Sequence, residues 1–260
     1  MLQKGLSLKK RLRAGELTFG AWVSFADQAA AEIMAGVGFD WVLIDTEHAP
    51  FSLESLACVL MAFNGRPTVP IVRAPWNDRV MIKQILDLGA GGILVPYVCS
   101  VEEARAAVAA CRYPPQGVRG FGPRRASDYY RRTDEYIRLA NEAVICAIQI
   151  EHIDAVKQAR EILAVPDIDV VLLGPMDLSG SLGLLGQLDH PQVVAAVEQV
   201  VAEGRRANLP VGIPVDAPPD VVAQWVAKGS QFVIVGEDHS LLRRAATETL
   251  ARFRRQVLGE

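Results

Sequence analysis

The chain repeats one pattern eight times: a short apolar run rich in β-branched or aromatic residues, followed by a helical pattern. The runs are apolar throughout, which is typical of strands buried on both faces of a parallel sheet. Eight such units in one chain of domain length predict a closed (β/α)₈ barrel, that is, a TIM barrel of the α/β class. An open doubly wound sheet is the alternative, but such sheets usually have fewer strands. The predicted strands are Phe19–Phe25, Trp41–Asp45, Val69–Arg73, Gly92–Val95, Val144–Ile150, Val170–Leu173, Val211–Val215 and Phe232–Val235, and the predicted helices are Gln28–Ala35, Leu53–Phe63, Arg79–Leu88, Val101–Ala110, Ala155–Leu163, Pro191–Ala207, Pro219–Ala227 and Ser240–Val257.

The length of 260 residues fits one such domain, because (β/α) barrels commonly use about 250 residues. We find no shift in composition that marks a linker, and we therefore expect residues 1–260 to form a single barrel domain. The longest irregular segment is Arg112–Thr133. Loops of this length in compact domains are usually functional or mobile.

The charge balance argues against nucleic acid and membrane partners. The formal net charge is −3, whereas nucleic-acid binding needs a basic surface. Basic residues cluster locally in Lys9–Arg13, Arg124–Arg132 and Arg252–Arg255, and we expect each cluster to be a solvated face. No apolar stretch approaches the roughly 18 residues of a membrane span, and the N-terminal segment lacks the apolar run of a secretory signal.

The cysteines indicate a reducing compartment. Cys58, Cys99, Cys111 and Cys146 show no CxxC spacing, so neither a zinc knuckle nor a disulfide framework is expected. We interpret them as reduced core thiols of a cytoplasmic protein.

Polar residues gather where the predicted strands end, and in a barrel of this kind the chemistry lies at those carboxyl ends. The second, third, fifth and sixth strands bring a candidate base, a cation and at least two carboxylates to one mouth. The residues concerned are Asp45–His48, Arg73, Gln149 with Glu151, and Gly174–Asp177; the eighth strand adds Glu237–His239.

Glu151 and Asp177 are the candidate metal ligands. Two hard carboxylate oxygens suit a divalent ion and leave positions of an octahedral ion open for water and substrate. Gln149 stands two residues before Glu151, so both side chains lie on the same side of the strand. The alternative is that each carboxylate caps the helix that follows it. The pair on adjacent strands, with Gln149 beside it, favours the metal site.

His48 is the candidate general base. Asp45, three residues before it, could hold one imidazole nitrogen and raise the basicity of the other. The alternative for His48 is a loop histidine that caps the next helix, and for Arg73 it is a buried salt bridge. The remaining histidines, His152, His190 and His239, lack a partner pattern and are assigned no role.

Two further features narrow the chemistry. Gly174–Gly186 is glycine-rich at a helix start, where backbone N–H groups could hold a carboxylate or a phosphate, but it matches neither GxGxxG nor a P-loop. None of the lysines ends a predicted strand, so a Schiff-base lysine is hard to place. Carbanion chemistry at this mouth would therefore need a metal ion to stabilise an enolate.

Six segments occur in the same order in one known family: GFDWVLIDTEHAP, VRAPWND, IKQILDLGAGGILVP, RYPPQGVRG, IQIE and GPMDLS. They resemble the metal-dependent class II pyruvate aldolases of the aldolase/citrate lyase superfamily, which cleave 4-hydroxy-2-oxoheptanedioate or 2-keto-3-deoxyglucarate. The resemblance runs from about Phe19 to the last helix, and IDTEHAP together with GPMDLS makes it specific. It implies reversible cleavage of 4-hydroxy-2-oxo acids to pyruvate and an aldehyde, with oxaloacetate decarboxylation as a side activity.

The resemblance also implies roles for the residues at the mouth. Glu151 and Asp177 would hold a divalent ion, typically Mg²⁺, Mn²⁺ or Co²⁺. The carboxylate and keto end of pyruvate would be held by Gln149 and the backbone from Gly174 through Met176 to Asp177. His48, with Asp45, would act as the base, and Arg73 would stabilise the enolate charge.

Other implied roles involve a second subunit. Asp87 matches a family carboxylate that tunes the histidine, yet it ends a helix at the far end of its own barrel. It could therefore reach only the site of a neighbouring subunit, so we expect a homo-oligomer, typically a hexamer. The last helix, at about residues 240–257, would pack on a partner. Trp22 matches a tryptophan of the family's pocket, although a core aromatic is an equally good interpretation.

The part of the site that would bind the aldehyde is less defined by the sequence. The paired Arg124 and Arg125 could bind a carboxylate or phosphate of the aldehyde, because guanidinium groups suit both anions. Alternative functions are a carbon–carbon lyase acting on CoA esters, as in the citrate lyase branch, a non-catalytic barrel that binds oxo acids, and, more weakly, a metal-dependent phosphodiesterase.

Overall fold

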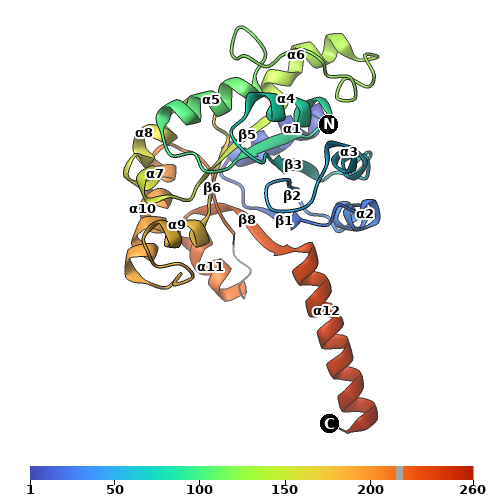
Figure 1. Ribbon diagram of the computed structural model, residues 1–260, viewed down its shortest axis with the longest axis vertical. Helices are drawn as coiled ribbons and strands as arrows, with labels where there is room; N and C mark the ends of the chain where they lie inside the picture. The colour runs from blue at the N-terminus through green and yellow to red at the C-terminus, as the bar shows by residue number, and fades with distance from the viewer. Residues whose placement is uncertain (215–218, 260) are drawn as a thin grey trace.

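Eight parallel strands form one closed barrel in chain order, and the first strand pairs with the last (Figure 1). The structure is a computed structural model that describes residues 1–214 and 219–259. The predicted (β/α)₈ barrel is confirmed, and the open sheet is wrong. The strands are β1 (Thr18–Val23), β2 (Trp41–Asp45), β3 (Val69–Arg73), β4 (Gly92–Val95), β5 (Ile145–Ile150), β6 (Val170–Leu173), β7 (Val211–Pro214) and β8 (Ser230–Glu237).

Helices surround the barrel and include counterparts of all eight predicted helices; those at 133–143 and 175–181 are additional. They are α2 (Gln28–Gly36), α3 (Leu53–Met61), α4 (Arg79–Asp87), α5 (Val101–Cys111), α6 (Thr133–Ala143), α7 (Ile153–Lys157), α8 (Ala159–Leu163), α9 (Pro175–Ser181), α10 (Pro191–Arg206), α11 (Pro219–Lys228) and α12 (Asp238–Phe253). The single helix predicted over Ala155–Leu163 is wrong: Gln158, at φ −106° and ψ 13°, separates α7 from α8. Val215, the predicted end of the seventh strand, lies outside the described residues.

A further helix, α1 (Leu2–Arg13), closes the N-terminal end of the barrel, and the sequence pattern did not predict it. Leu8 and Leu12, one turn apart, join the apolar cluster inside the barrel. Lys9 lies between them in sequence and is only 5% exposed; its Nζ atom is 2.9 Å from Asp169 Oδ2. The prediction of Lys9–Arg13 as a solvated face is therefore wrong for Lys9, because a buried carboxylate pairs with it.

The interior of the barrel is filled by side chains at alternate positions of the strands. At its base the Trp41 indole stacks on Phe232, with 3.5 Å between the ring centroids, and its Nε1–H donates to Thr18 Oγ1 at 3.0 Å. Gly20 faces this indole: a Cβ atom at position 20 would lie 2.2 Å from the ring. The ring therefore requires a glycine on the neighbouring strand.

The structure bears on the expectations for the cysteines and for membrane-spanning helices. The four cysteines are free thiols, and two of them, Cys111 and Cys146, are buried. Within residues 1–214 and 219–259, no helix combines the length and the apolar character needed to cross a membrane.

Gly20→Ala should lower the free energy of unfolding by about 1–3 kcal/mol, because the added methyl group overpacks a buried and stacked indole. Urea denaturation would measure the change. The matched control is Gly36→Ala at the end of α2, where an added Cβ has no neighbour within 4 Å among the described residues. Equal stability of the two variants would contradict this account of the core.

Candidate active site

A cavity of about 490 Å³ opens at the carboxyl ends of the strands. It brings together eight of the residues that the sequence singles out: Trp22, Asp45, His48, Arg73, Gln149, Gly174, Met176 and Asp177. Ser24, Leu188, Ile234, Glu237 and His239 also line it. The expected convergence of strand ends on one mouth is thus found in the structure.

The guanidinium of Arg73 is fixed by two carboxylates. Its Nε and Nη2 atoms donate to Asp45 Oδ1 at 2.9 Å and Oδ2 at 2.7 Å, and Nη1 lies 3.1 Å from Glu47 Oε2. Its Cζ atom also lies 4.5 Å from the centroid of the Trp22 ring. Burial raises the pKa of Asp45, but the hydrogen bonds and charge of Arg73 outweigh it and leave the pKa lowered. Asp45 is thus held as an anion beside a fixed cation.

The predicted contact between Asp45 and the His48 imidazole is absent from this arrangement of the described residues. Asp45 Oδ1 instead accepts from the backbone N–H groups of Glu47 at 3.0 Å and His48 at 3.3 Å. The imidazole Nε2 lies 3.8 Å from Glu47 Oε2, and the side chain is 69% exposed at the cavity. Arg73 takes both carboxylate oxygens of Asp45, so Asp45 shapes the turn that carries His48 and does not bind the ring.

Glu151 lies behind the cavity wall, where it is 4% exposed. Its Oε1 accepts from the backbone N–H of Tyr97 at 2.8 Å, and its Oε2 accepts from Gln149 Nε2 at 2.6 Å. Burial raises the pKa of Glu151 to about 7; the hydrogen bond from Tyr97 opposes the shift, and the charge of Asp177 adds to it. A carboxyl group in this setting is stabilised in its charged form by an added cation.

Gly174 and Gln149 complete this part of the wall. A Cβ atom at position 174 would lie 2.4 Å from Glu151 Oε2, so a glycine lets the next strand approach the carboxylate. The Gln149 Oε1 atom is buried, and no described group hydrogen-bonds to it. Buried amide oxygens without a partner are uncommon and point to a missing ligand or water.

Asp177 lies in the first turn of α9, which begins directly after β6. It lines the same cavity as Gln149, and its charge acts on Glu151. Asp177 and Glu151, which follow the adjacent strands β6 and β5, are therefore close enough for their charges to interact. The position of Asp177 in a first helical turn also fits the capping interpretation. In residues 1–214 and 219–259, no cluster of three or more His, Cys, Asp or Glu side chains is placed to hold a metal ion.

The sequence reasoning gave no role to a polar cluster where β1 meets β8. Asp238 is 6% exposed and accepts four hydrogen bonds, two of them from the backbone N–H groups of Ser24 and Phe25 at 2.8 Å. Ser24 Oγ lies 3.2 Å from His239 Nδ1, and His239 Nε2 lies 3.1 Å from Glu237 Oε2. The available signal was the run of three polar residues, Glu237 to His239, at the end of the eighth strand.

Asp87 and Arg124 do not line the cavity. Asp87 ends α4, so it lies at the N-terminal end of the barrel, where its Oδ1 accepts from Arg119 Nη2 at 2.8 Å. Arg119 is 2% exposed and lies against the Tyr113 ring at 4.5 Å. Ala126 N–H donates to the Asp87 backbone oxygen, which places the segment that carries Arg124 at the same end. The structure therefore places Arg124 away from the cavity of its own chain.

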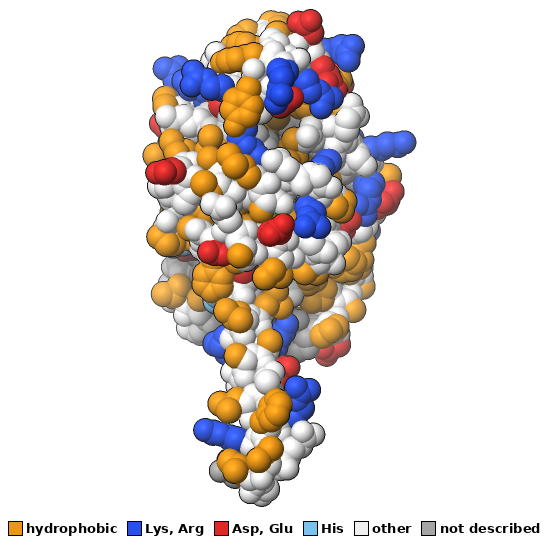
Figure 2. Space-filling view, turned by 90° about the vertical axis from the view of Figure 1, so that its right-hand side faces the viewer, with side chains coloured by type: hydrophobic (Ala, Val, Ile, Leu, Met, Phe, Trp, Pro, Cys, Tyr) orange, Lys and Arg blue, Asp and Glu red, His pale blue; other side chains and the backbone are white. Residues whose placement is uncertain are grey.

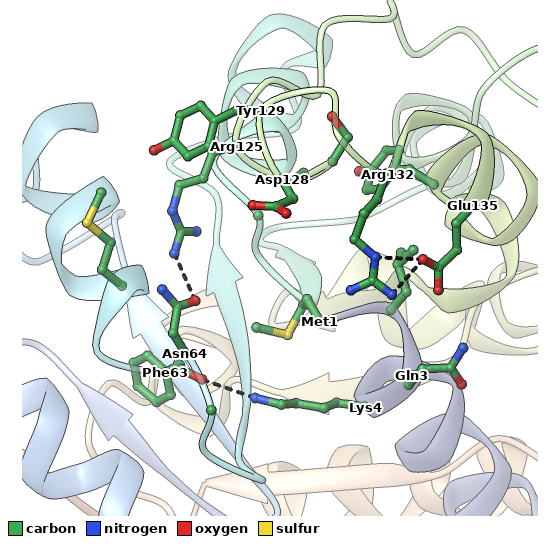
Figure 3. Close-up of a pocket in the computed structure, with 17 residues that line it drawn as sticks. Met1, Gln3, Lys4, Phe63, Asn64, Arg125, Asp128, Tyr129, Arg132 and Glu135 are labelled. Atoms are coloured by element: carbon green, nitrogen blue, oxygen red, sulfur yellow. Dashed lines mark hydrogen bonds and ion pairs between the residues drawn. The ribbon is translucent and has the colours of Figure 1, made fainter.

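A second cavity, of about 470 Å³, lies at this N-terminal end (Figure 3). Lys4 Nζ donates to Phe63 O at 3.0 Å, Arg125 donates to Leu88 O and to Asn64, and Arg132 pairs with Glu135. Lys4 and Arg125 therefore bind carbonyl oxygens just after α3 and α4, a stabilising arrangement, whereas Arg132 pairs with a carboxylate. Arg125, expected together with Arg124 to bind an anionic group of the substrate, here binds the Leu88 carbonyl oxygen.

Glu151→Gln should make the chelator-treated protein more stable than wild type at pH 8. A carboxyl group whose pKa rises from its usual 4.5 to about 7 on folding binds its proton more tightly in the fold. Wild-type stability should therefore fall as the pH rises between these two values, by up to about 3 kcal/mol. Thermal unfolding of both proteins in EDTA, at pH 5 and pH 8, would measure the difference.

A glutamine at position 151 can keep the bond from the Tyr97 N–H through its Oε1, and a Gln149 amide that has turned over would present its partnerless Oε1 to accept from the new Nε2. Glu161→Gln, an exposed position on α8, is the control. A stability difference between Glu151→Gln and wild type that does not change with pH would contradict the raised pKa.

Comparisons with known proteins agree with this arrangement. The family model described as HpcH/HpaI aldolase/citrate lyase matches residues 18–245. The chain is 43% identical over 248 residues to the 4-hydroxy-2-oxo-heptane-1,7-dioate aldolase of Salmonella typhimurium, covering 95% of this chain and 94% of that protein.

Solved structures of the family have the same fold. An HpcH/HpaI aldolase/citrate lyase family protein from Burkholderia cenocepacia superposes with a TM-score of 0.91 at 36% identity, covering 95% of this chain and 99% of the other. The citrate synthase SbnG gives a TM-score of 0.86 at 31% identity, covering 96% and 98%. With its barrel, its strand-end residues and the match over most of its length, the chain belongs to the HpcH/HpaI aldolase/citrate lyase family.

Proposed function

We propose that the protein is a carbon–carbon lyase, an aldolase that reversibly cleaves 4-hydroxy-2-oxo acids to pyruvate and an aldehyde. The observation that carries the proposal is one cavity that joins the carboxylate of Asp177 and the amide of Gln149 to the fixed guanidinium of Arg73 and the exposed imidazole of His48. The curated relatives named as aldolases of a 4-hydroxy-2-oxo acid support it.

The residues around Glu151 fit a divalent metal ion. Carboxylate oxygens of Glu151 and Asp177 and the partnerless amide oxygen of Gln149 form a hard oxygen donor set, which suits Mg²⁺, Mn²⁺ or Co²⁺. The two carboxylates would hold the ion, and the substrate and water would complete its coordination. Once bound, such an ion acts as a Lewis acid that polarises the keto oxygen and stabilises negative charge there.

Arg73 stabilises the same charge from the protein side. Its guanidinium is fixed by Asp45, so it needs no reorganisation when the enolate forms. A preorganised donor of this kind typically contributes about 3–4 kcal/mol to a developing oxyanion. The Gln149 side chain and the backbone from Gly174 to Asp177 orient the carboxylate and keto end of the substrate.

His48 moves the proton. In cleavage, its imidazole takes the proton from the C4 hydroxyl, the C3–C4 bond breaks, and the bonding electrons pass into the pyruvate enolate. The C4 carbon leaves as an aldehyde, and protonation of the enolate at C3 gives pyruvate. Oxaloacetate would lose CO₂ through the same enolate, which makes decarboxylation an expected side activity.

Pyruvate in D₂O should exchange its methyl protons in the presence of the protein, because the reverse reaction begins with the same enolate. Proton NMR of the methyl signal would follow the exchange. We expect EDTA to stop it and Mg²⁺, Mn²⁺ or Co²⁺ to restore it. Absence of exchange with all three metals would overturn the aldolase and favour a lyase acting on CoA esters or an oxo-acid-binding barrel.

Two variants distinguish the roles of the residues. His48→Ala should slow exchange about 100-fold or more while the thermal unfolding curve stays unchanged, since it removes an exposed base.

Asp177→Ala should lose metal binding, measured by calorimetry, together with exchange. Full activity of His48→Ala, or unchanged metal binding by Asp177→Ala, would remove that residue from its proposed role.

The last helix supports the proposal that the protein is a homo-oligomer, expected to be a hexamer. α12 projects away from the barrel (Figure 1), and Figure 2 shows hydrophobic side chains along it. Leu250, Phe253 and Val257 are 55%, 56% and 72% exposed in the single chain. Burial of such side chains stabilises association. A second subunit could also bring Asp87 or Arg124 of one chain to the cavity of the next.

The double substitution Leu250→Glu with Phe253→Glu should convert the oligomer to smaller species, because it places two charges on this apolar face. Light scattering after size-exclusion chromatography would measure the mass. Arg252→Glu, a charge change between the same positions, is the control and should keep the oligomer. A monomeric wild-type protein would contradict the proposal.

A further inference from the structure

Ser24, Glu237 and His239, here called the β1–β8 cluster, form one side of the cavity. The ring of eight strands places β1 and β8 across the barrel from β5, which carries Gln149 and Glu151. The cluster therefore faces the cavity from the side opposite the groups proposed to bind pyruvate. The other reactant, the aldehyde, must occupy the remaining part of the cavity.

The β1–β8 cluster is held in place by the fold. Asp238 Oδ1 accepts from Ser24 Oγ at 2.6 Å, and its Oδ2 holds the Ser24 backbone N–H at 2.8 Å. The single hydroxyl hydrogen of Ser24 goes to Asp238, so the contact with His239 Nδ1 at 3.2 Å leaves Oγ as the acceptor. His239 Nε2 lies 3.1 Å from Glu237 Oε2. Hydroxyl, imidazole and carboxylate groups are thus presented together.

These groups remain within reach of a ligand. The side chain of His239 is 50% exposed and that of Glu237 is 38% exposed, whereas Asp238 beneath them is almost fully buried. Adjacent donors and acceptors on a fixed frame suit the hydroxyl groups of a polyol, because each hydroxyl both donates and accepts.

The charge of the cavity disfavours an acceptor with a second carboxylate. Arg73 is the sole lysine or arginine among the described residues that line the cavity, and Asp45 and Glu47 already pair with it. On the β1–β8 side of the cavity the charged side chain is Glu237, which lies 3.1 Å from His239. A carboxylate at the far end of the substrate would meet Glu237, whereas an uncharged hydroxyl could hydrogen-bond to it.

We propose that the β1–β8 cluster is the acceptor subsite of the enzyme and selects uncharged, hydroxylated aldehydes such as a 2,3-dihydroxy aldehyde. The proposal rests on the proposed aldolase function and specifies its second substrate. The aldehyde hydroxyls would bind Ser24, Glu237 and His239 while the carbonyl carbon faces the pyruvate enolate. No covalent step is assigned to the cluster.

The test compares three acceptors in the aldol direction with pyruvate: glyceraldehyde, propanal and succinic semialdehyde. For the wild-type protein we expect kcat/KM for glyceraldehyde to exceed that for each of the other two by about tenfold or more. Ser24→Ala, Glu237→Gln and His239→Ala should each lower the value for glyceraldehyde about 3- to 10-fold and leave propanal unchanged.

Two controls separate selectivity from folding and from the pyruvate half-reaction. Deuterium exchange into pyruvate alone should be unchanged in all three variants, because the cluster does not contact pyruvate. His190→Asn replaces a histidine outside the cavity that begins α10, and asparagine keeps a capping acceptor there, so its acceptor preference should match wild type.

The possible results distinguish failure of the acceptor subsite from failure of the aldolase function. Preference for succinic semialdehyde, or an equal loss with glyceraldehyde and propanal in the variants, overturns the subsite while exchange into pyruvate preserves the aldolase. Absence of exchange in the wild-type protein overturns both. Loss confined to glyceraldehyde supports the assignment.

Discussion

Closure of the barrel is the constraint on which the rest of the structure depends. The first strand must meet the last, and beyond the paired strands Asp238 accepts three hydrogen bonds that join the end of β8 to Ser24 and Phe25 after β1. At the opposite end Trp41 and Phe232 stack inside the barrel, and α1 covers them. With both ends fixed, the strand ends between them keep one arrangement, and polar groups far apart in sequence share one cavity.

The electrostatics of the mouth follow from the gathering of these polar groups in one cavity. Carboxylates outnumber cations there, and the one guanidinium in the described cavity wall neutralises Asp45 first. Glu151 accepts two hydrogen bonds and pairs directly with no cation among the described residues; burial raises its pKa to about 7, although the charge of Arg73 acts in the opposite direction. The same fold thus creates one ion pair and one buried carboxyl group whose charged form an added cation would stabilise. This difference favours the proposed metal site at Glu151 over one at Asp45.

Much of this arrangement could be predicted from local sequence. Strands buried on both faces read as apolar runs, so four of the eight have the predicted bounds, and Arg73, Gln149 and Asp177 were placed at the mouth from their positions at strand ends. Which side chains bind each other could not be predicted in this way. Asp45 stands three residues from His48 but binds Arg73, because a guanidinium on the adjacent strand offers two parallel donors. The place of Arg124 could not be predicted, because a long segment can run to either end of a barrel. α1 was missed because its apolar residues cover the barrel, which sequence periodicity does not show.

The two sides of the cavity come from different parts of the chain. The ends of strands β2, β3, β5 and β6 supply an imidazole, a guanidinium, an amide and carboxylates, whereas the ends of β1 and β8 supply Ser24, Glu237 and His239. The side proposed to bind pyruvate consists of groups that constrain one another, since Gly174, Gln149 and Glu151 lie against one another. On the β1–β8 side, Glu237 and His239 are more exposed and lie beside Asp238. Their side chains take no part in the contacts of Asp238 with the backbone of Ser24 and Phe25. Substitutions at Glu237 and His239 would change the polarity of this side while the contacts of Asp238 with Ser24 and Phe25 remain. Under the proposed function, such a barrel would keep the pyruvate half-reaction and vary the second substrate.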